Sequence, residues 1–357
     1  MKIKFVSNLY PSKNKPYKGT FVRNVFEGFK SQGGDVSLLT LRDSSDRKLN
    51  KLIDYMLFTW RAFVSGLLSN ESDIHYIHYT SHSSLGLIIA SLFKSKNKLC
   101  VVSNVHGSDI LPGNSSIFSR IKIMLSKKIL DKSVLVISPS GYFKHILSEE
   151  YAVSEKKIIV SPSGGVDSSI FKPSNFVQKE FTFGYVGRLE ENKGIFELLE
   201  AFRSIQQTNP TSTLLFVGSG SREAQLKEIA SSMSGVTILK GVEQGELVSV
   251  YQSIKFLVFP SKASESLGLI PIEAMMCGTP VLSSTVGATK DYIVSDMRTL
   301  SFEPGNINEL KVSLSIATQM SDIDYCRFSK LAIETANSYS SNKVIEDLYR
   351  VLMSRFI

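Results

Sequence analysis

Short apolar runs, each followed by an amphipathic stretch at helical spacing, recur along this chain in two separate series. The first series opens with the run 3–7 and the helical stretch 20–32, and the second with 181–187 and 194–206. Strands that alternate with helices form a parallel sheet covered on both faces. The sequence therefore predicts an α/β protein with two doubly wound parallel sheets. Further strands are predicted at 36–41, 74–79, 99–104, 134–138, 158–160, 214–218, 236–239, 256–260 and 280–283.

The length of 357 residues exceeds what one core usually fills, so two domains are expected. The polar stretch 167–180, which carries Pro173, is the best linker candidate. We place the domains at 1–172 and 173–342, with a purely helical tail beyond residue 321.

Cysteine usage and hydropathy exclude several classes of protein. The three cysteines, Cys100, Cys277 and Cys326, form no CxxC pair, which argues against a disulfide scaffold, a zinc ribbon and a dithiol redox site. No apolar run approaches the roughly 18 residues that cross a bilayer, and no cleaved signal is recognisable. We expect a cytoplasmic protein.

The positive charge is confined to the first half of the chain. Residues 1–172 hold 24 basic and 13 acidic residues, a net charge of +11, whereas the remainder holds 17 and 20, a net charge of −3. A one-sided positive field favours an anionic partner: nucleic acid, an anionic membrane surface or a phosphorylated substrate. No basic stretch is interleaved with stacking aromatics, so nucleic acid is not expected.

A predicted helix at 116–132 carries part of this charge. One side is apolar, and the flanks are basic. Such a helix lies on anionic lipid or steers a pyrophosphate-bearing acceptor; alternatively, it packs on its own sheet and exposes solvated lysines. The apolar residues are Ile117, Ile121, Met124, Leu125 and Ile129, and the basic residues are Arg120, Lys122, Lys127 and Lys128.

The stretch Tyr185-Val-Gly-Arg-Leu-Glu-Glu-Asn-Lys-Gly194 follows a predicted strand. Gly187 at the strand end allows a ligand to approach the backbone. Arg188 and Lys193 lie at the mouth of the next helix, where a diphosphate also gains from the helix N-terminus. A solvated loop with two surface cations is the alternative interpretation.

A second stretch combines two acids with a helix start, at residues 260–281. Glu265 precedes the predicted helix, Glu273 lies within it, and residues 266–268 offer backbone N–H groups. Carboxylates accept hydrogen bonds from hydroxyls, so the two acids suit a sugar and a ribose on either side of an anion. Alternatively, Glu265 caps the helix and Glu273 is an exposed helical residue.

Together these stretches resemble the retaining family-4 glycosyltransferases of GT-B architecture. The patterns G-R-L-x-x-x-K-G and E-x7-E, the latter continuing as E-A-M-x-C-G-x-P-V, stand at the separation typical of that family. The resemblance covers most of residues 1–320 and is most specific over 181–305. Further matching stretches are 163–167, 171–173, 217–220 and 302–306.

The resemblance implies a role for each matching residue. Arg188 and Lys193 correspond to the cations that hold the donor diphosphate, beside Gly187. Glu273 corresponds to the acid that binds the ribose, and Glu265 to the acid that binds the transferred sugar. Ser266, Leu267 and Gly268 correspond to the backbone cradle.

In the first domain, His106 corresponds to the histidine that faces the donor sugar and the reaction centre, in the segment that ends at Asp109. Gly19 stands where the family usually has two adjacent glycines near the donor phosphate. Only one is present here, so the acceptor side is less closely matched.

The implied architecture is two Rossmann-like domains that face each other across a cleft. The second domain, 173–342, would bind a nucleotide-sugar, usually a UDP-sugar in this family, and the first, 1–172, would bind the acceptor. A C-terminal helix at about 343–357 would pack back on the first domain. No cofactor or metal is implied.

The implied activity is retaining transfer of a hexosyl or N-acetylhexosaminyl group to a hydroxyl of a glycan or lipid-linked acceptor, in cell-surface polysaccharide or lipopolysaccharide biosynthesis. A nucleotide-sugar epimerase of the same fold and an inactive partner of another transferase are the alternatives. A peripheral position on the cytoplasmic membrane face is the expected location.

Three histidines between residues 75 and 82 superficially resemble a metal site. On a strand, His75 and His78 point to opposite faces and cannot share an ion. We expect no zinc there, and instead expect His78 or Tyr79, near the strand end, to line an acceptor groove.

Overall fold

The computed structural model describes residues 1–12, 15, 18–41, 48–94, 99–111, 116–174, 178–293 and 295–356. The contacts divide the chain into a first unit, Met1–Gly165 with Ser341–Ile357, and a second unit, Val166–Ser340. The expected boundary after residue 172 lies a few residues further along. The structural division comes earlier because Val166 pairs with Ser340 and Phe171 belongs to the core of the second unit.

The sheet of the first unit has six parallel strands in the order β2-β1-β3-β4-β5-β6. Strand β1 has β2 on one side and β3 on the other, so the direction of winding changes between β1 and β3. Ligands of such sheets bind beyond the carboxyl ends of the strands at this point. The strands are β1 Ile3–Ser7, β2 Val36–Thr40, β3 Ile74–His78, β4 Cys100–Asn104, β5 Leu135–Ser138 and β6 Ile158–Val160.

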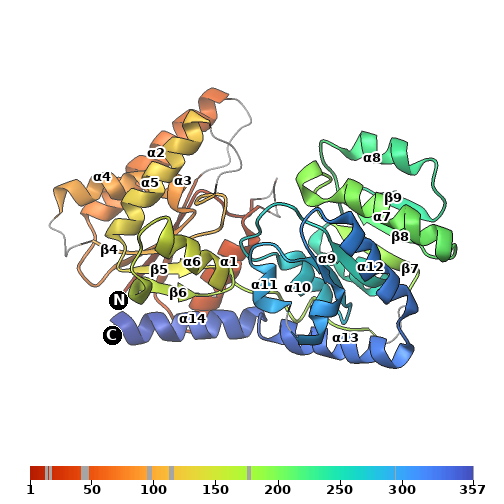
Figure 1. The fold of residues 1–357 in the computed structure, drawn as a ribbon. Coiled ribbons are helices and arrows are strands. Elements are labelled where there is room, and N and C mark those ends of the chain that lie inside the picture. The colour runs from red at the N-terminus through yellow and green to blue at the C-terminus, as the bar shows by residue number, and fades with distance from the viewer. Residues whose placement is uncertain are drawn as a thin grey trace. The chain divides into compact units, whose positions relative to one another are not determined.

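Alternating side chains of these strands build two cores, one on each face of the sheet. Phe5 and Tyr76 pack with helices α1 and α14, and Val6 and Ile77 pack on the opposite face with α2, α4 and α5. Figure 1 shows α14 along one side of the sheet and α2, α4 and α5 on the other. The helices are α1 Thr20–Ser31, α2 Lys48–Leu67, α3 Thr80–Ser83, α4 Leu85–Phe93, α5 Ile117–Lys132, α6 Gly141–Glu149 and α14 Ser341–Phe356.

Helix α14 comes from the far end of the chain and packs on α1. Gly28 makes this possible, because a Cβ atom at this position would lie 2.5 Å from Cγ2 of Ile345. Ile345, Leu348 and Leu352 complete the core on that face. The C-terminal helix is therefore part of the first unit.

The large apolar side chains of helix α5 are buried only in its C-terminal half. Ile129 and Leu130 are buried, whereas Ile117, Ile121 and Met124 are exposed. The interpretation of a helix that packs on its own sheet and exposes solvated lysines is confirmed for the C-terminal half, where Leu125, Ile129 and Leu130 pack in the cores and Lys127 and Lys128 are exposed. None of the helices in the described part of the chain is both long and apolar enough to cross a membrane.

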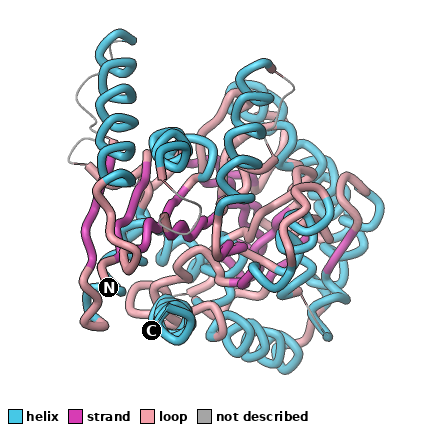
Figure 2. The backbone as a smooth tube through the Cα atoms, turned by 90° about the vertical axis from the view of Figure 1, so that its left-hand side faces the viewer, coloured by secondary structure: helices cyan, strands magenta, loops and turns pink. Residues whose placement is uncertain are grey.

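The second unit repeats the architecture with the strand order β12-β11-β10-β7-β8-β9, again all parallel. Read from β9, this is the Rossmann order, with the change of winding between β7 and β10. Figure 2 shows the helices around the strands in a second view. The strands are β7 Phe181–Val186, β8 Leu214–Val217, β9 Val236–Leu239, β10 Ile254–Phe259, β11 Val281–Ser284 and β12 Ser301–Phe302, and the helices are α7 Ile195–Thr208, α8 Glu223–Ala230, α9 Gln244–Ser253, α10 Leu269–Met276, α11 Thr289–Tyr292, α12 Ile307–Gln319 and α13 Asp322–Asn337.

Candidate active site

The two motifs of the second unit meet where its sheet changes direction. The loop after β7 carries Arg188 and Lys193, and the loop after β10 carries Glu265. The strands β7 and β10 are neighbours in the sheet, so their following loops emerge side by side. The topology thus joins stretches that lie about 70 residues apart in the sequence.

Gly194 lets these two loops touch. Its φ of 72° is left-handed, and a Cβ atom there would overlap the carbonyl group of Pro260, so a larger residue would separate the loops. The carbonyl oxygen of Asn192 accepts hydrogen bonds from the N–H groups of Lys262, at 2.9 Å, and Ala263, at 3.1 Å. The glycine that ends the first motif is therefore required by the packing.

Lys193 and Glu265 form an ion pair, with Nζ and Oε1 2.5 Å apart. The hydroxyl of Ser261 also donates to Oε1, at 3.0 Å. Both charged side chains are largely shielded from solvent, with 15% and 19% exposed. An ammonium has three donors, so Lys193 can hold Glu265 and still donate to a phosphate oxygen.

Arg188 is exposed on the same loop as Lys193. Its backbone carbonyl accepts a 2.7 Å hydrogen bond from the hydroxyl of Tyr185, which fixes the loop at the strand end. Among the described residues, no ion pair engages its guanidinium. Gly187 has a φ of 146°, and a Cβ atom there would lie 3.1 Å from the hydroxyl of Tyr185. The glycine therefore allows the close packing at the strand end from which the exposed Arg188 follows.

Residues 266–268 lead into α10, whose N-cap is Gly268 with φ 77°. A Cβ atom on Gly268 would lie 2.7 Å from the hydroxyl of Tyr292, and that hydroxyl donates to the Gly268 carbonyl at 3.2 Å. The carbonyl of Glu265 accepts a bond from the Ala288 N–H at 3.0 Å. No side chain caps α10, so the interpretation of Glu265 as its capping acid receives no support.

Glu273 is buried inside α10, with 7% of the residue exposed. The interpretation of Glu273 as an exposed helical residue is wrong, because α10 is buried along most of its length. The hydroxyl of Tyr251 donates to its Oε2 at 2.8 Å. Burial raises the pKa of Glu273 to about 7, although the bond from Tyr251 opposes this shift. No sequence signal identifies Tyr251 as a partner of this acid.

In the first unit, His106 follows β4 and contacts His78 at the end of β3. Nδ1 of His78 and Nε2 of His106 are 2.9 Å apart, and the rings stack. Burial lowers the pKa of His106 to about 3 and, with the neighbouring His106, holds that of His78 well below its usual value. Both rings are therefore neutral near pH 7, and one donates to the other. His78 is fully buried, so of the two residues expected to line an acceptor groove, His78 does not, whereas Tyr79 is partly exposed.

A buried carboxylate fixes the position of His106. Asp109 accepts bonds from the N–H of His106 at 3.0 Å, the N–H of Thr80 at 2.9 Å and the Thr80 hydroxyl at 3.0 Å. Its own carbonyl accepts a bond from Ser126 of α5. Burial raises the pKa of Asp109 while the backbone N–H groups oppose this shift. Asp109 is thus a positioning residue that joins the loops after β3 and β4.

Gly19 is the N-cap of α1, with φ 76°, and a Cβ atom there would lie 2.8 Å from the backbone carbon of Leu9. The glycine therefore allows the start of α1 to pack on the loop after β1. Two residues later, the ring of Phe21 lies 4.6 Å from that of His106. Phe21 was not identified from the sequence, although it follows the glycine that was.

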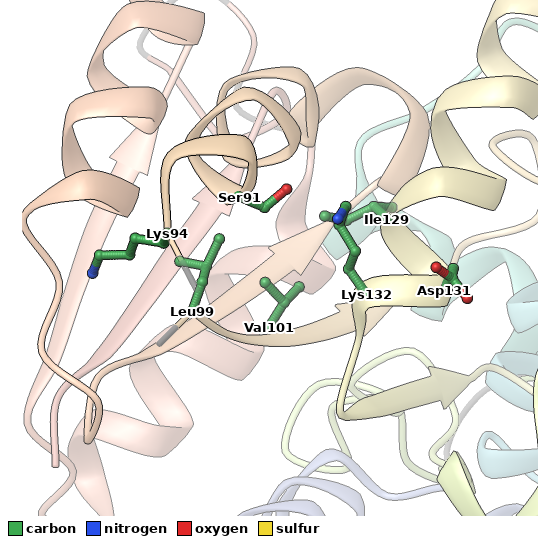
Figure 3. Close-up of a pocket in the computed structure, with 7 residues that line it drawn as sticks. All are labelled: Ser91, Lys94, Leu99, Val101, Ile129, Asp131 and Lys132. Atoms are coloured by element: carbon green, nitrogen blue, oxygen red, sulfur yellow. The ribbon is translucent and has the colours of Figure 1, made fainter. Parts of the chain in front are cut away.

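The pocket in Figure 3 lies at the opposite edge of the first sheet. It has a volume of about 300 Å³ and lies between β4 and helices α4 and α5. Leu99 directly precedes β4 and Val101 lies near its amino end, whereas His106 follows its carboxyl end. The pocket is therefore separate from the candidate site. Within the described ranges, no group of three or more His, Cys, Asp or Glu side chains could hold a metal ion.

Two family profiles match the chain one after the other. Glycosyltransferase Family 4 matches residues 19–168, and Glycosyl transferases group 1 matches residues 166–324. The chain belongs to the family-4 glycosyltransferases. This family-4 glycosyltransferase has two six-stranded parallel sheets that match known GT-B structures, and it uses a nucleotide-sugar donor.

Relatives of this glycosyltransferase are distant. An uncharacterised glycosyltransferase of Methanocaldococcus jannaschii is 25% identical over 262 residues, which cover 72% of this chain and 69% of that protein. The capsular polysaccharide biosynthesis glycosyltransferase CapM of Staphylococcus aureus is 27% identical over 49% of this chain and 50% of its own length. The structure of Anabaena HepE in complex with UDP-glucose has a TM-score of 0.70 and 17% identity, covering 99% of this chain and 100% of that one.

Proposed function

We propose that this family-4 glycosyltransferase is a retaining enzyme that transfers a hexosyl or N-acetylhexosaminyl group from a UDP-sugar to a hydroxyl of a glycan or lipid-linked acceptor. We assign it to cell-surface polysaccharide or lipopolysaccharide biosynthesis. The observation that carries the donor assignment is the group of Arg188, Lys193 and Glu265 where the second sheet changes direction. This group pairs cations for a diphosphate with an acid for sugar hydroxyls.

The names of similar proteins support the finer assignments. HepE was solved with UDP-glucose, which favours UDP among the donor nucleotides. CapM is named for capsular polysaccharide biosynthesis, which favours a cell-surface glycan as the product. The nucleotide and the acceptor are therefore proposals, and both are open to direct measurement.

Catalysis in this proposal is electrostatic. As the bond between the sugar and the diphosphate breaks, negative charge grows on the leaving phosphate oxygen. Arg188, Lys193 and the N-terminus of α10 would stabilise that charge, and interactions that strengthen as charge develops lower the barrier. Glu273 would accept bonds from the ribose hydroxyls, with Tyr251 holding its second oxygen.

The acceptor hydroxyl would attack the face from which the diphosphate departs, and its proton would pass to the departing phosphate oxygen. Glu265 would orient the sugar hydroxyls without bonding to the sugar carbon. His106 would contact the sugar as a neutral ring, because its pKa of about 3 leaves it uncharged near pH 7. Asp109 and His78 would hold His106 in place.

We further place the protein at the cytoplasmic face of a membrane. Arg120, Lys127 and Lys128 are exposed on α5, and Lys122 is partly exposed. Lys127 lies 5.4 Å from the ring centroid of Tyr151. These cations would be attracted to anionic lipid, at about 1 kcal/mol for each cation near the surface.

A thermal-shift titration with UDP, GDP and ADP tests the donor assignment. A ligand at 100 times its Kd stabilises the folded state by about 2.7 kcal/mol. We expect UDP to raise the melting temperature more than GDP or ADP, and Arg188→Ala to reduce this shift. With UDP-sugar and acceptor, Arg188→Ala should lower the transfer rate by about 100-fold or more, since losing one donor to a developing anion costs roughly 3 kcal/mol.

Arg203→Ala is the matched control, because this arginine lies on the exposed side of α7. Equal shifts with all three nucleotides would contradict the UDP assignment. Unchanged turnover of Arg188→Ala at saturating donor would remove Arg188 from the site. Consumption of UDP-sugar without acceptor, yielding an epimerised sugar, would replace the transferase proposal.

A further inference from the structure

Helix α2 exposes a row of large apolar side chains along one face. Leu52, Met56 and Trp60 are 59%, 64% and 61% exposed. Leu49, Ile53 and Leu57 extend the row at helical spacing and are exposed as well. We call these six residues the α2 apolar row. Isolated exposed apolar residues are ordinary, but a contiguous set on one helix face indicates an interaction surface.

The row lies opposite the side by which α2 packs on its own unit. Phe58, Ala62 and Gly66 are buried and face α4. A Cβ atom at Gly66 would lie 2.7 Å from that of Ala90, and one at Gly86 would lie 2.8 Å from that of Ala62. This close approach fixes the orientation of α2. The row is therefore held outward by tight packing.

The N-terminal half of α2 has no core behind it. No side chain from residue 49 to residue 57 is buried. In Figure 1 the N-terminal ends of α2 and α5 extend beyond the strands of the first sheet. The exposed residues of α5 also lie in its N-terminal half, at Ile117, Phe118, Ile121 and Met124. We call these four residues the α5 tip.

The charge around these helices indicates what would cover them. Together, α2 and α5 carry eight basic and two acidic residues. A second copy of the chain would bring the same positive helices against each other, at a cost in repulsion. An anionic surface would meet them with favourable charge. Apolar residues that include a tryptophan, with lysine and arginine nearby, are the side chains of a helix that lies at a lipid interface.

We propose that the α2 apolar row lies in the interface of an anionic phospholipid bilayer, with the α5 tip as a second contact. Leucine, methionine and tryptophan side chains would enter the boundary between headgroups and acyl chains, and the cations would remain among the anionic headgroups. This inference rests on the membrane location proposed above and names the surface that makes the contact; it does not depend on which donor or acceptor is used.

Helices α2 and α5 begin at the same edge of the first sheet as the candidate-site residues of this unit. Helix α2 follows β2 and α5 follows β4, so their N-terminal ends lie at the carboxyl edge of the first sheet. Gly19, Phe21 and His106 belong to the loops and the helix start at the same edge. Lipid contact through α2 and α5 would therefore bring this edge close to the membrane surface.

Trp60 makes the proposal directly measurable, because it is the single tryptophan of the chain. Full-length protein is titrated with vesicles of phosphatidylcholine and phosphatidylglycerol, and with vesicles of phosphatidylcholine alone. We expect the tryptophan emission to move to shorter wavelength and acrylamide quenching to weaken with the anionic vesicles. Co-sedimentation of the protein with the vesicles gives the affinity.

The double variant Leu52→Glu/Met56→Glu tests the row itself while Trp60 stays in place as the reporter. Its affinity for anionic vesicles should fall by at least about tenfold, because two inserted side chains become charged. Val312→Glu/Ile323→Glu is the matched control, since these residues are 59% and 84% exposed on the second unit. The control should bind vesicles within about twofold of the unaltered protein. Circular dichroism confirms that both variants fold.

Two results would overturn the proposal. One is binding of the unaltered protein to anionic vesicles with no change in Trp60 emission, or with a loss of affinity in Leu52→Glu/Met56→Glu that the control variant shows equally. The other is a dimer in sedimentation velocity that the row variant abolishes, with no vesicle binding by the unaltered protein. The vesicle measurements contain no nucleotide, so their failure would leave the donor assignment untouched, and the reverse also holds.

Discussion

At the scale of single residues, the ion pair between Lys193 and Glu265 connects two roles that the family resemblance keeps separate. The ammonium is expected to hold phosphate and the carboxylate to bind the sugar, yet each is the other's partner in the structure, at 2.5 Å. UDP lacks the sugar, so Glu265 would offset part of the positive charge of Lys193 and repel the diphosphate without contributing any contact of its own. Removing that negative charge should therefore have opposite effects on UDP and on UDP-sugar.

We expect Glu265→Gln to bind UDP up to about fivefold more tightly, given that partly exposed ion pairs are worth roughly 0.2–1 kcal/mol. Transfer from UDP-sugar by the same variant should fall, because a hydroxyl acceptor is lost. Isothermal titration and steady-state kinetics measure the two quantities. Glu223→Gln, which breaks the pair with Lys227 on α8, is the control and should change neither. Weaker UDP binding by Glu265→Gln would contradict the competition.

Glu273 should make stability depend on pH. Burial raises its folded-state pKa to about 7, so between pH 4.5 and 7 the folded state holds a proton that the unfolded state has released. Stability therefore falls as the pH rises through this window, by about 3 kcal/mol in total. His78 and His106, whose pKa values are lowered by burial, change stability in the opposite direction over this range. The contribution of Glu273 is therefore measured as a difference: between pH 5 and pH 7.5, urea unfolding should show the unaltered protein losing about 2 kcal/mol relative to Glu273→Gln. The same pH dependence in both proteins would contradict this contribution.

At the scale of secondary structure, the sequence pattern identified β1 to β11 because each is a short, mainly apolar run, whereas β12, only two residues long, was missed. Helix α2 was missed, since the usual signal is an apolar face directed at the core, and here the apolar row faces solvent. Helix α4 was missed because Leu85–Phe93 is apolar nearly all round and shows little periodicity. For α5, periodicity identified the helix but could not tell which half has a core behind it.

In the candidate site, too, the sequence marked individual residues but not the contacts between them. Local spacing marked Arg188, Lys193, Glu265 and Glu273, and the family resemblance supplied expected roles. The contacts between Lys193 and Glu265 and between His78 and His106 depend on which strands are neighbours, β7 with β10 and β3 with β4. Strand order is set by the packing of helices on the sheet, and no local pattern encodes it.

Helices α1 and α14 pack closely where Gly28 meets Ile345. Gly28→Val should destabilise the protein by about 2 kcal/mol or more, because the new side chain would overlap Ile345 in a closely packed core. Adding Ile345→Ala should recover part of the loss, since it removes the atoms that overlap. Chemical unfolding of the two single variants and the double variant measures the coupling. Strictly additive losses would show that α14 moves aside without cost.

At the scale of the whole molecule, the two units have separate cores and separate sheets. The second unit holds its own ion pair, helix start and buried acid, and none of these contacts needs a side chain of the first unit. A chain built this way need not unfold in one step. The proposed donor nucleotide should therefore stabilise the second unit against unfolding much more than the first.

Hydrogen exchange detected by mass spectrometry can follow each unit separately. In moderate urea, saturating UDP should slow exchange in β7 and β10 by the factor that its binding free energy sets, about 100-fold at 100 times its Kd. Exchange in β1 and β3 should change much less, because ligand binding stabilises only the unit whose unfolding releases the ligand. Leu348→Ala on α14 should produce the complementary result, with faster exchange in β1 and β3 and little change in β7 and β10. Equal slowing of all four strands by UDP would mean that the two units unfold together, and that the first unit shares the binding energy of the nucleotide.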